Sequence, residues 1–254
     1  MKKFAIFCLC FLILATACQR DSSWQRVQAT GILKVGLDPT YPPFELADGQ
    51  PLAGLDVDLA EALAADLGVR AEFVYFGYDG LYDALLTEQV DVLISALVIA
   101  PERMEDFAYS EPYFNAGEIL IVQQGESDVT EMADLHGRIL AVELGAQGHV
   151  EALQWAQQLP DLTVQPFNSA DEALTAVISD TADATLIDSI SGRLFLHQNP
   201  EAGLTWLPDP VTVEPYAIVV RRDDQSLLEQ LDASLKRLQA SGELATITEK
   251  WLGP

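Results

Sequence analysis

Two charged side chains follow structural signals that suit them to bind a small charged molecule. Arg103 comes directly after Pro101 and Glu102, and its guanidinium can bind a carboxylate through two parallel hydrogen bonds. Asp188 follows the apolar run 184–187, so we expect it at the end of a buried strand. A guanidinium suits an anionic group of a ligand and a carboxylate suits a cationic one. The alternatives are a surface arginine at a helix start and an aspartate that caps a helix.

The three histidines show neither the spacing of a metal site nor that of a catalytic triad. His136, His149 and His197 are instead expected on helices or loops. We therefore expect no catalytic residue, no bound metal and no cofactor.

The composition is that of an ordinary globular protein with an unusually acidic surface. Of the 254 residues, 49% are hydrophobic and 21% are charged, which allows a sizeable core. The formal net charge is -25, and so acidic a surface repels phosphate backbones and anionic lipids. We therefore expect no nucleic-acid partner, whereas the charge suits either solubility or the attraction of cationic ligands.

The N-terminus has the features of an export signal. Lys2 and Lys3 precede the apolar run 4–14, which is too short to span a bilayer comfortably, and small residues follow it. We expect a signal peptide over residues 1–17, a polar tether over residues 18–29, and export to the periplasm or the cell surface.

Cys18 decides between two kinds of processing. The stretch 14–18 resembles a bacterial lipobox, in which the cysteine becomes the lipidated N-terminus, although Ala15 stands where an aliphatic residue is usual. The residues before Cys18 also fit an ordinary signal peptidase site. We favour lipidation at Cys18, with this lipid as the only attachment to the membrane. Since the other two cysteines lie in the apolar run, no internal disulfide is expected.

Strand-like and helix-like stretches then alternate in two series. The first contains the β-type run 32–37 and leucines at helical spacing over 55–67. The second starts near residue 119 and ends with a strand at 217–220, which an amphipathic helix follows. Such alternation predicts an α/β protein whose sheets are mostly parallel and flanked by helices.

Three elements in a fixed order carry a resemblance to a known family. Residues 38–44 read DPTYPPF, residues 101–103 read PER, and residues 241–244 read SGEL. Together they resemble the polar amino-acid family of bacterial periplasmic binding proteins, which is the solute-binding family 3 of ABC importers. The resemblance covers nearly all of residues 31–254.

The resemblance implies a type II periplasmic-binding-protein clamp of two α/β lobes joined by two hinge strands. Lobe 1 would contain residues 30–116 and 217–254, and lobe 2, with the hinge strands, residues 117–216. In such α/β units the ligand binds in a cleft at strand ends. The implied protein is a monomer that captures a small amino acid and delivers it to the permease subunits of an ABC importer.

By resemblance, Arg103 binds the ligand carboxylate and Asp188 binds the ligand ammonium. The loop of Ser95, Ala96 and Val98 would add backbone N–H groups to the carboxylate site. Here the sequence departs from the family, which usually has Ser or Thr at the position of Val98. Losing that hydroxyl costs about 1–2 kcal/mol, so the affinity is lower, another group compensates, or the ligand is not a standard α-amino acid.

Six more residues would surround the ligand side chain, namely Asp38, Tyr41 and Tyr78 on lobe 1 and Glu143, Gly145 and Gln147 on lobe 2. The tyrosines would provide flat aromatic walls, with core packing as the alternative. Gly145 lets the backbone approach a ligand. Glu143 beside Asp38 would favour a cationic side chain such as that of arginine, lysine or ornithine. Their alternatives are a solvated Glu143 and a turn cap at Asp38.

Two other functions remain open on the same fold. Some relatives of these binding proteins are dehydratases that act on cyclic acids, and Glu143 would then serve as a general acid. The same clamp also serves as the sensory domain of signalling proteins.

Overall fold

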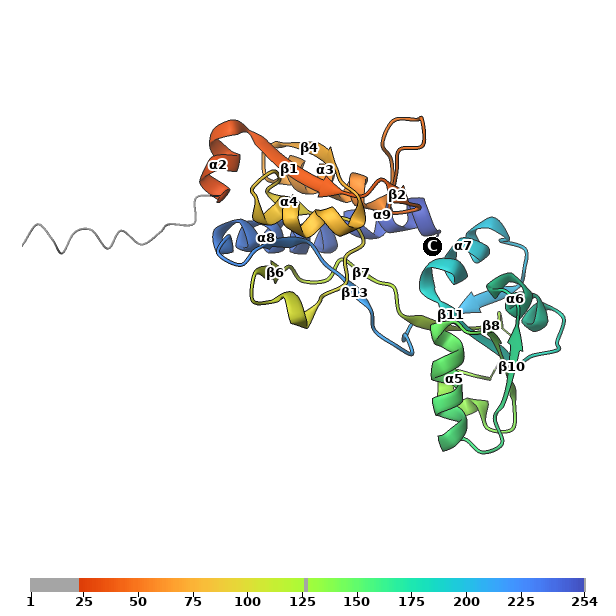
Figure 1. The fold of residues 1–254 in the computed structure, drawn as a ribbon. Helices are drawn as coiled ribbons and strands as arrows, with labels where there is room; N and C mark the ends of the chain where they lie inside the picture. The colour runs from red at the N-terminus through yellow and green to blue at the C-terminus, as the bar shows by residue number, and fades with distance from the viewer. Residues whose placement is uncertain (1–22, 126–127, 254) are drawn as a thin grey trace, which may run out of the picture.

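The computed structural model describes residues 23–125 and 128–253. The expected signal peptide and Cys18 lie outside these described residues. Within them, no helix is both long and apolar enough to cross a membrane. The described chain forms two α/β lobes that a pair of strands connects (Figure 1).

Lobe 1 is built on a five-stranded mixed sheet. The strand order is β4 (Arg70–Tyr75), β1 (Ile32–Leu37), β5 (Val92–Leu93), β14 (Val219–Arg221) and β6 (Phe107–Tyr109). β1 pairs in parallel with β4 and β5, whereas β14 runs antiparallel to β5 and β6. Helices join the parallel strands because a parallel connection must cross over the sheet.

Helices cover both faces of this sheet. One face carries α3 (Leu55–Asp66), α8 (Gln225–Ser241) and α9 (Glu243–Leu252), together with an N-terminal helix described below, and the opposite face carries α4 (Leu81–Leu86). The stripe that the leucine spacing predicts is buried, since Leu55, Leu59 and Leu63 belong to the core. Four short elements complete lobe 1: β2 (Thr40–Tyr41), β3 (Glu45–Leu46), η2 (Tyr78–Gly80) and η3 (Pro101–Arg103).

The segment expected as a polar tether is in part a helix that packs on lobe 1. α2 (Ser23–Thr30) contacts β1 and α8, and its Val27 is fully buried in the core. Trp24 packs against the same core. These two apolar residues are three positions apart and share one helix face. The polar composition of the segment hid this short amphipathic pattern.

Lobe 2 repeats the architecture with a second five-stranded mixed sheet. The strand order is β10 (Thr163–Phe167), β9 (Ile139–Glu143), β11 (Ala184–Asp188), β8 (Glu118–Gln123) and β12 (Leu204–Trp206). The first three strands are parallel, and β8 runs antiparallel to β11 and β12. Both sheets are therefore parallel over three strands and antiparallel over the remainder.

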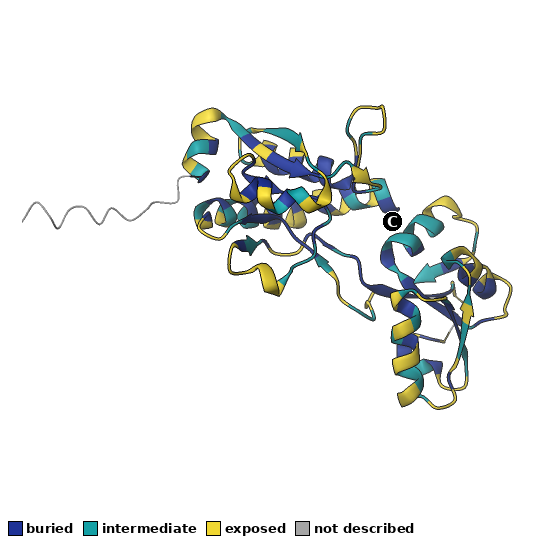
Figure 2. Ribbon diagram, in the orientation of Figure 1, coloured by how far each residue is buried: buried dark blue, intermediate teal, exposed yellow. Residues whose placement is uncertain are grey.

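The helices of lobe 2 enclose separate cores on the two sides of the sheet. The helical elements are α5 (Gln147–Gln158), α6 (Ala170–Ile178), α7 (Ser189–Gln198) and the turn η4 (Met132–Leu135). α5 covers one face, while α6 and α7 cover the other. Each lobe thus has buried residues of its own (Figure 2).

Two antiparallel strands connect the lobes. β7 (Phe114–Asn115) leaves lobe 1, and β13 (Pro215–Tyr216) returns to it. Phe114 and Tyr216 each pack edge-on against Phe44 in the core of lobe 1, with ring centroids 5.3 Å apart. The hinge is therefore anchored firmly in lobe 1.

Asn115 and Gly117 fasten the crossing point. Asn115 Oδ1 accepts hydrogen bonds from the backbone N–H groups of Glu214 at 2.6 Å and of Gly117 at 3.2 Å. A Cβ atom at position 117 would lie 2.1 Å from the carbonyl oxygen of Thr212, so only glycine permits this close approach.

Candidate ligand-binding site

Asp38 and Ser95 lie beyond the carboxyl ends of two neighbouring parallel strands, β1 and β5. The buried Ser95 hydroxyl donates to Glu45 Oε1 at 2.6 Å and accepts the backbone N–H of Asp38 at 3.0 Å. The Asp38 carboxylate accepts hydrogen bonds from Thr40 Oγ1 at 2.8 Å and from the backbone N–H of Tyr78 at 2.9 Å. The structure thus gives Asp38 the capping role and uses the Ser95 proton inside the protein.

The loop that follows Ser95 presents its backbone groups unequally. Ala96 adopts a left-handed conformation with φ 47°, and its N–H donates to Asp56 Oδ2 at 2.6 Å. In this arrangement the Ala96 N–H is committed to Asp56. Val98 lies opposite Tyr216 in an antiparallel bridge, and the hydrogen bonds of this bridge are made by the residues before and after Val98. In such a pair the N–H of Val98 itself points away from Tyr216. No backbone partner of the Val98 N–H is found among the described residues.

A buried pair of acids lies beneath this loop. Glu45 and Asp56 are almost completely inaccessible to solvent, and Glu45 Oε2 and Asp56 Oδ1 have no conventional donor among the described residues. Burial, and then the negative charge of Asp56, raises the pKa of Glu45 far above its ordinary value. The raised pKa favours the protonated form of Glu45, in which the acid can donate a hydrogen bond to Asp56.

Arg103 stands exposed at the end of η3, with its guanidinium held over an aromatic ring. Its Cζ atom lies 4.1 Å from the centroid of Tyr82, a cation–π contact. Arg103 takes no part in the ion pairs found among the described residues. The guanidinium is thus oriented by Tyr82 and has no carboxylate partner among the described residues.

Tyr41 and Tyr78 are surface rings in lobe 1. Their side chains are 45% and 61% exposed, respectively, so neither ring is packed inside the core. Tyr41 stacks on Phe44 with centroids 5.7 Å apart, so its inner face is fixed by the core and its outer face is free. The backbone of Tyr78 is held by Asp38 as described above.

On lobe 2 the predicted residues gather at one edge of the sheet. Glu143 is the last residue of β9 and Asp188 is the last of β11, and these two strands are parallel. Gly145 adopts φ 85° where the chain turns into α5, which begins at Gln147. One oxygen of Asp188 accepts the backbone N–H of Ser191 at 2.8 Å and caps α7. This edge is acidic, in contrast to the cation at Arg103.

Glu118 joins this acidic edge, although the sequence gave no reason to select it. It is the first residue of β8 and pairs in register with Asp188. Burial, and then the charges of Asp188 and of three other carboxylates, raises the pKa of Glu118 to about 7. The sequence feature that could have identified Glu118 is its place as an acid directly before the apolar run 119–122.

The other unpredicted residues had similar signals. Asp56 lies on the buried stripe of α3, four and seven residues before Ala60 and Leu63, where an apolar side chain is expected. Glu45 is the first residue of the strand β3 and comes directly after the buried Phe44. Each is an acid in an apolar pattern, and such an acid needs a partner.

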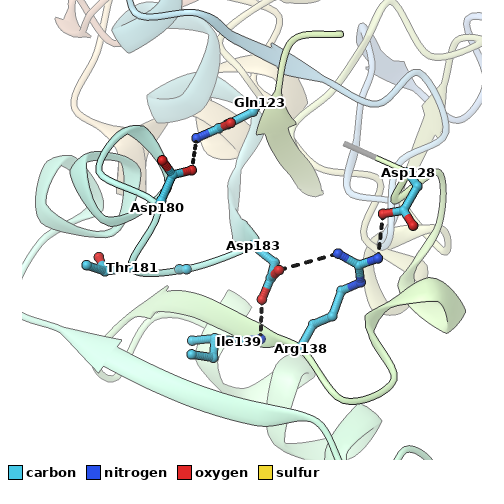
Figure 3. Close-up of a pocket in the computed structure, with 8 residues that line it drawn as sticks. Gln123, Asp128, Arg138, Ile139, Asp180, Thr181 and Asp183 are labelled. Carbon is cyan, nitrogen blue, oxygen red and sulfur yellow. Dashed lines mark hydrogen bonds and ion pairs between the residues drawn. The ribbon is translucent and has the colours of Figure 1, made fainter. Parts of the chain in front are cut away.

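A separate pocket of about 280 Å³ lies at the opposite end of the lobe 2 sheet (Figure 3). Arg138 is placed there between Asp128 and Asp183, and Asp183 also accepts the backbone N–H of Ile139 at 2.7 Å. Asp183 and Arg138 precede β11 and β9, so this pocket is at the amino ends of those strands. Its one arginine is already paired with two aspartates, and ligands of open α/β sheets bind at the carboxyl ends instead.

Comparison with known proteins identifies the class to which this clamp belongs. The model of the bacterial extracellular solute-binding proteins, family 3, matches residues 33–254, and the chain belongs to this family. The arginine-binding extracellular protein ArtP of Bacillus subtilis is 27% identical over 253 residues, which cover 99% of this chain and 98% of the relative.

Two solved structures share this two-lobed fold. The L-cystine solute receptor of Neisseria gonorrhoeae, unliganded and open, is 26% identical, covers 91% of this chain and 97% of its own, and superimposes with a TM-score of 0.77. An ancestral arginine-binding protein bound to arginine is 33% identical, covers 88% and 99%, and gives only 0.52. The chain therefore superimposes better on the open cystine receptor than on the arginine-bound ancestral protein, although the latter is more similar in sequence.

Proposed function

We propose that this protein captures a polar amino acid with a cationic side chain by lobe closure and delivers it to the permease of an ABC importer. The observation that carries the proposal is the separation of charge between the lobes. Lobe 1 offers Arg103, which has no carboxylate partner among the described residues. Lobe 2 offers Asp188 and Glu143 at the carboxyl ends of parallel strands.

The proposed capture uses both lobes at once. The ligand carboxylate binds Arg103 and the N–H of Val98, while its ammonium binds the oxygen of Asp188 that does not cap α7. A ligand that bridges two lobes gains its full binding energy only when they are closed, so binding shifts the population from open to closed. The family and the relative named for arginine binding support this proposal.

We also propose that the mature protein is exported and anchored by a lipid at Cys18. The family of extracellular solute-binding proteins supports export. Mass spectrometry of the mature N-terminus tests the anchor: a diacylglyceryl adduct on Cys18 supports it, and an unmodified Cys18 contradicts it.

The capture itself is tested by screening ligands against the mature protein. A ligand that binds only the folded state raises the melting temperature. We expect stabilisation by arginine, lysine or ornithine, and its loss in Arg103→Ala and Asp188→Asn. Arg70→Ala is the matched control, because Arg70 is an exposed arginine that pairs with Glu72. Turnover of prephenate or arogenate, without stabilisation by amino acids, would instead favour the dehydratase function.

A further inference from the structure

Glu118 occupies the point where the chain enters lobe 2 from the hinge. It pairs in register with Asp188 across two antiparallel strands, and directly opposite residues of such a pair project from the same face about 5 Å apart. The backbone N–H of Glu118 donates to Thr212 Oγ1 at 2.8 Å. The carboxyl group is therefore held in place beside Asp188 by the local backbone.

The Glu118 side chain is buried without a polar partner of its own. The residue is only 5% exposed, and Oε2 has no hydrogen-bond partner among the described residues. A Cβ atom at Gly148, in the first turn of α5, would lie 2.6 Å from that oxygen. The glycine thus leaves the space into which the carboxyl group projects.

Four other carboxylates raise the pKa of Glu118 further through their negative charges. They are Asp188 at the end of β11, Glu143 at the end of β9, Glu151 on α5 and Glu214 in the hinge segment. None of these five acids takes part in the ion pairs of the described residues. The described residues also contain no group of His, Cys, Asp and Glu arranged to hold a metal ion. The missing positive charge must therefore come from elsewhere.

We propose that Glu118 and Asp188 together form a cation subsite on lobe 2, where an ammonium or guanidinium group of the ligand replaces a proton carried by Glu118 in the empty site. This inference rests on the proposed function and adds to it a second carboxylate and a coupling to protons. The exchange is balanced, because one positive charge enters the subsite and one proton leaves to solvent.

The electrostatic surroundings support this exchange. Burial and the neighbouring acids raise the pKa of Glu118 to about 7, so the empty site is substantially protonated at pH 6. A cation bound beside Glu118 stabilises the ionised form and lowers this pKa again. Capture of the cation is then about tenfold tighter at pH 8 than at pH 6, because the proton no longer competes.

Isothermal titration of the mature protein with arginine tests the subsite. Titrations at pH 6, 7 and 8, in two buffers with different ionisation enthalpies, give both the affinity and the number of protons released. We expect wild-type protein to release a proton near pH 6 to 7 and to bind about tenfold more tightly at pH 8. In Glu118→Gln, proton release and pH dependence should both disappear, with weaker binding at pH 8.

Two variants and one ligand serve as controls. Glu214→Gln removes an exposed acid of the same group, and it should keep the proton release. His149→Gln removes the imidazole of the residue after Gly148, and this variant should also keep the proton release. Glutamine, whose only cationic group is the α-ammonium, identifies the cation: release with both ligands assigns the α-ammonium, and release with arginine alone assigns the side chain.

The failure of this inference is distinct from failure of the proposed function. Arginine binding that depends on Arg103 and Asp188, with no proton release from wild-type protein, overturns the subsite and leaves the capture intact. The wild-type titration needs no variant, so it decides the matter even where Glu118→Gln does not fold. If no cationic amino acid binds at any pH, both proposals fall.

Discussion

Asp56 Oδ2 accepts the backbone N–H of Ala96 at 2.6 Å, and Ala96 has a positive φ of 47°. Left-handed backbone is unfavourable for a residue with a side chain, by about 1 kcal/mol or more. The bond to a buried carboxylate offsets this strain and fixes the direction of the loop that leads to Val98. The shape of the candidate carboxylate site thus depends on an acid that does not touch the ligand.

Replacing Asp56 by alanine should damage both stability and binding. The Ala96 N–H would lose its buried partner, which costs about 1–3 kcal/mol, and the loop would lose its conformation. Urea unfolding and calorimetry with arginine measure the two effects. Asp58→Ala is the control, because Asp58 on the same helix bonds Lys250 and Trp251 and should affect stability alone. Equal arginine affinity in both variants would show that Asp56 does not position the loop.

Replacing Glu45 by glutamine should be nearly neutral at pH 7. Protonated Glu45 accepts from Ser95 and donates to Asp56, and a glutamine amide provides the same acceptor and a donor. We expect the free energy of unfolding to change by less than about 1 kcal/mol, whereas Glu45→Leu loses both bonds and costs more. A Glu45→Gln variant as unstable as Glu45→Leu would mean that Glu45 is ionised in the folded protein.

Val98→Thr should tighten the binding of an amino acid. The new hydroxyl would lie beside the N–H that we assign to the ligand carboxylate, and one such bond contributes about 1–2 kcal/mol, or roughly five- to thirtyfold in Kd. The measurement is calorimetry with arginine. Val213→Thr, at a position that is 71% exposed, is the control and should leave the Kd unchanged. An unchanged Kd in Val98→Thr would place the carboxylate elsewhere.

Arg103 and Tyr82 should contribute unequally to affinity. Arg103→Lys keeps the charge and loses the paired hydrogen bonds, so we expect the Kd for arginine to rise about ten- to a hundredfold. Tyr82→Leu removes only the ring beneath the guanidinium, and we expect the Kd for arginine to rise about two- to fivefold. Calorimetry on both variants and on Arg70→Lys separates these effects. A larger loss in Tyr82→Leu than in Arg103→Lys contradicts this assignment.

Glu118 should make the folded protein less stable as the pH rises. Its pKa is raised in the folded state from 4.5 to about 7 by burial first and by Asp188 next. The unfolded chain therefore loses its proton earlier, and the stability contributed below pH 4.5 is lost as the pH rises through 7. Urea unfolding of wild-type protein and Glu118→Gln at pH 5 and 8 should show the variant gaining about 1–3 kcal/mol relative to wild type. The same gain in Glu214→Gln would point to general charge repulsion.

Apolar periodicity located the main elements well. Leucines at helical spacing predicted α3, and the apolar run before Asp188 predicted β11. The antiparallel strands β8 and β14 were read as strands, but their direction was not predictable, because direction depends on tertiary pairing. α2 was missed because two apolar residues carry little weight in a polar segment.

The sequence predicted which residues belong to the candidate site, but it predicted only a part of their contacts. The motif around Arg103 and the strand end at Asp188 mark charged groups that are exposed and half-buried, respectively, in the folded protein. The capping bonds of Asp38 and Asp188, and the commitment of the Ala96 N–H, depend on the exact backbone path. Glu118 stood out only after Asp188 was found opposite to it, since cross-strand register is a tertiary property.

The position of β14 sets an order in which the two lobes become complete. It lies between β5 and β6, yet it follows every strand of lobe 2 in the sequence. During synthesis, lobe 2 can therefore finish its sheet while lobe 1 still lacks an interior strand. The edges of β5 and β6 stay unpaired until residues 219–221 emerge, so we expect the contiguous lobe to fold first and the discontinuous lobe to close around the returning chain.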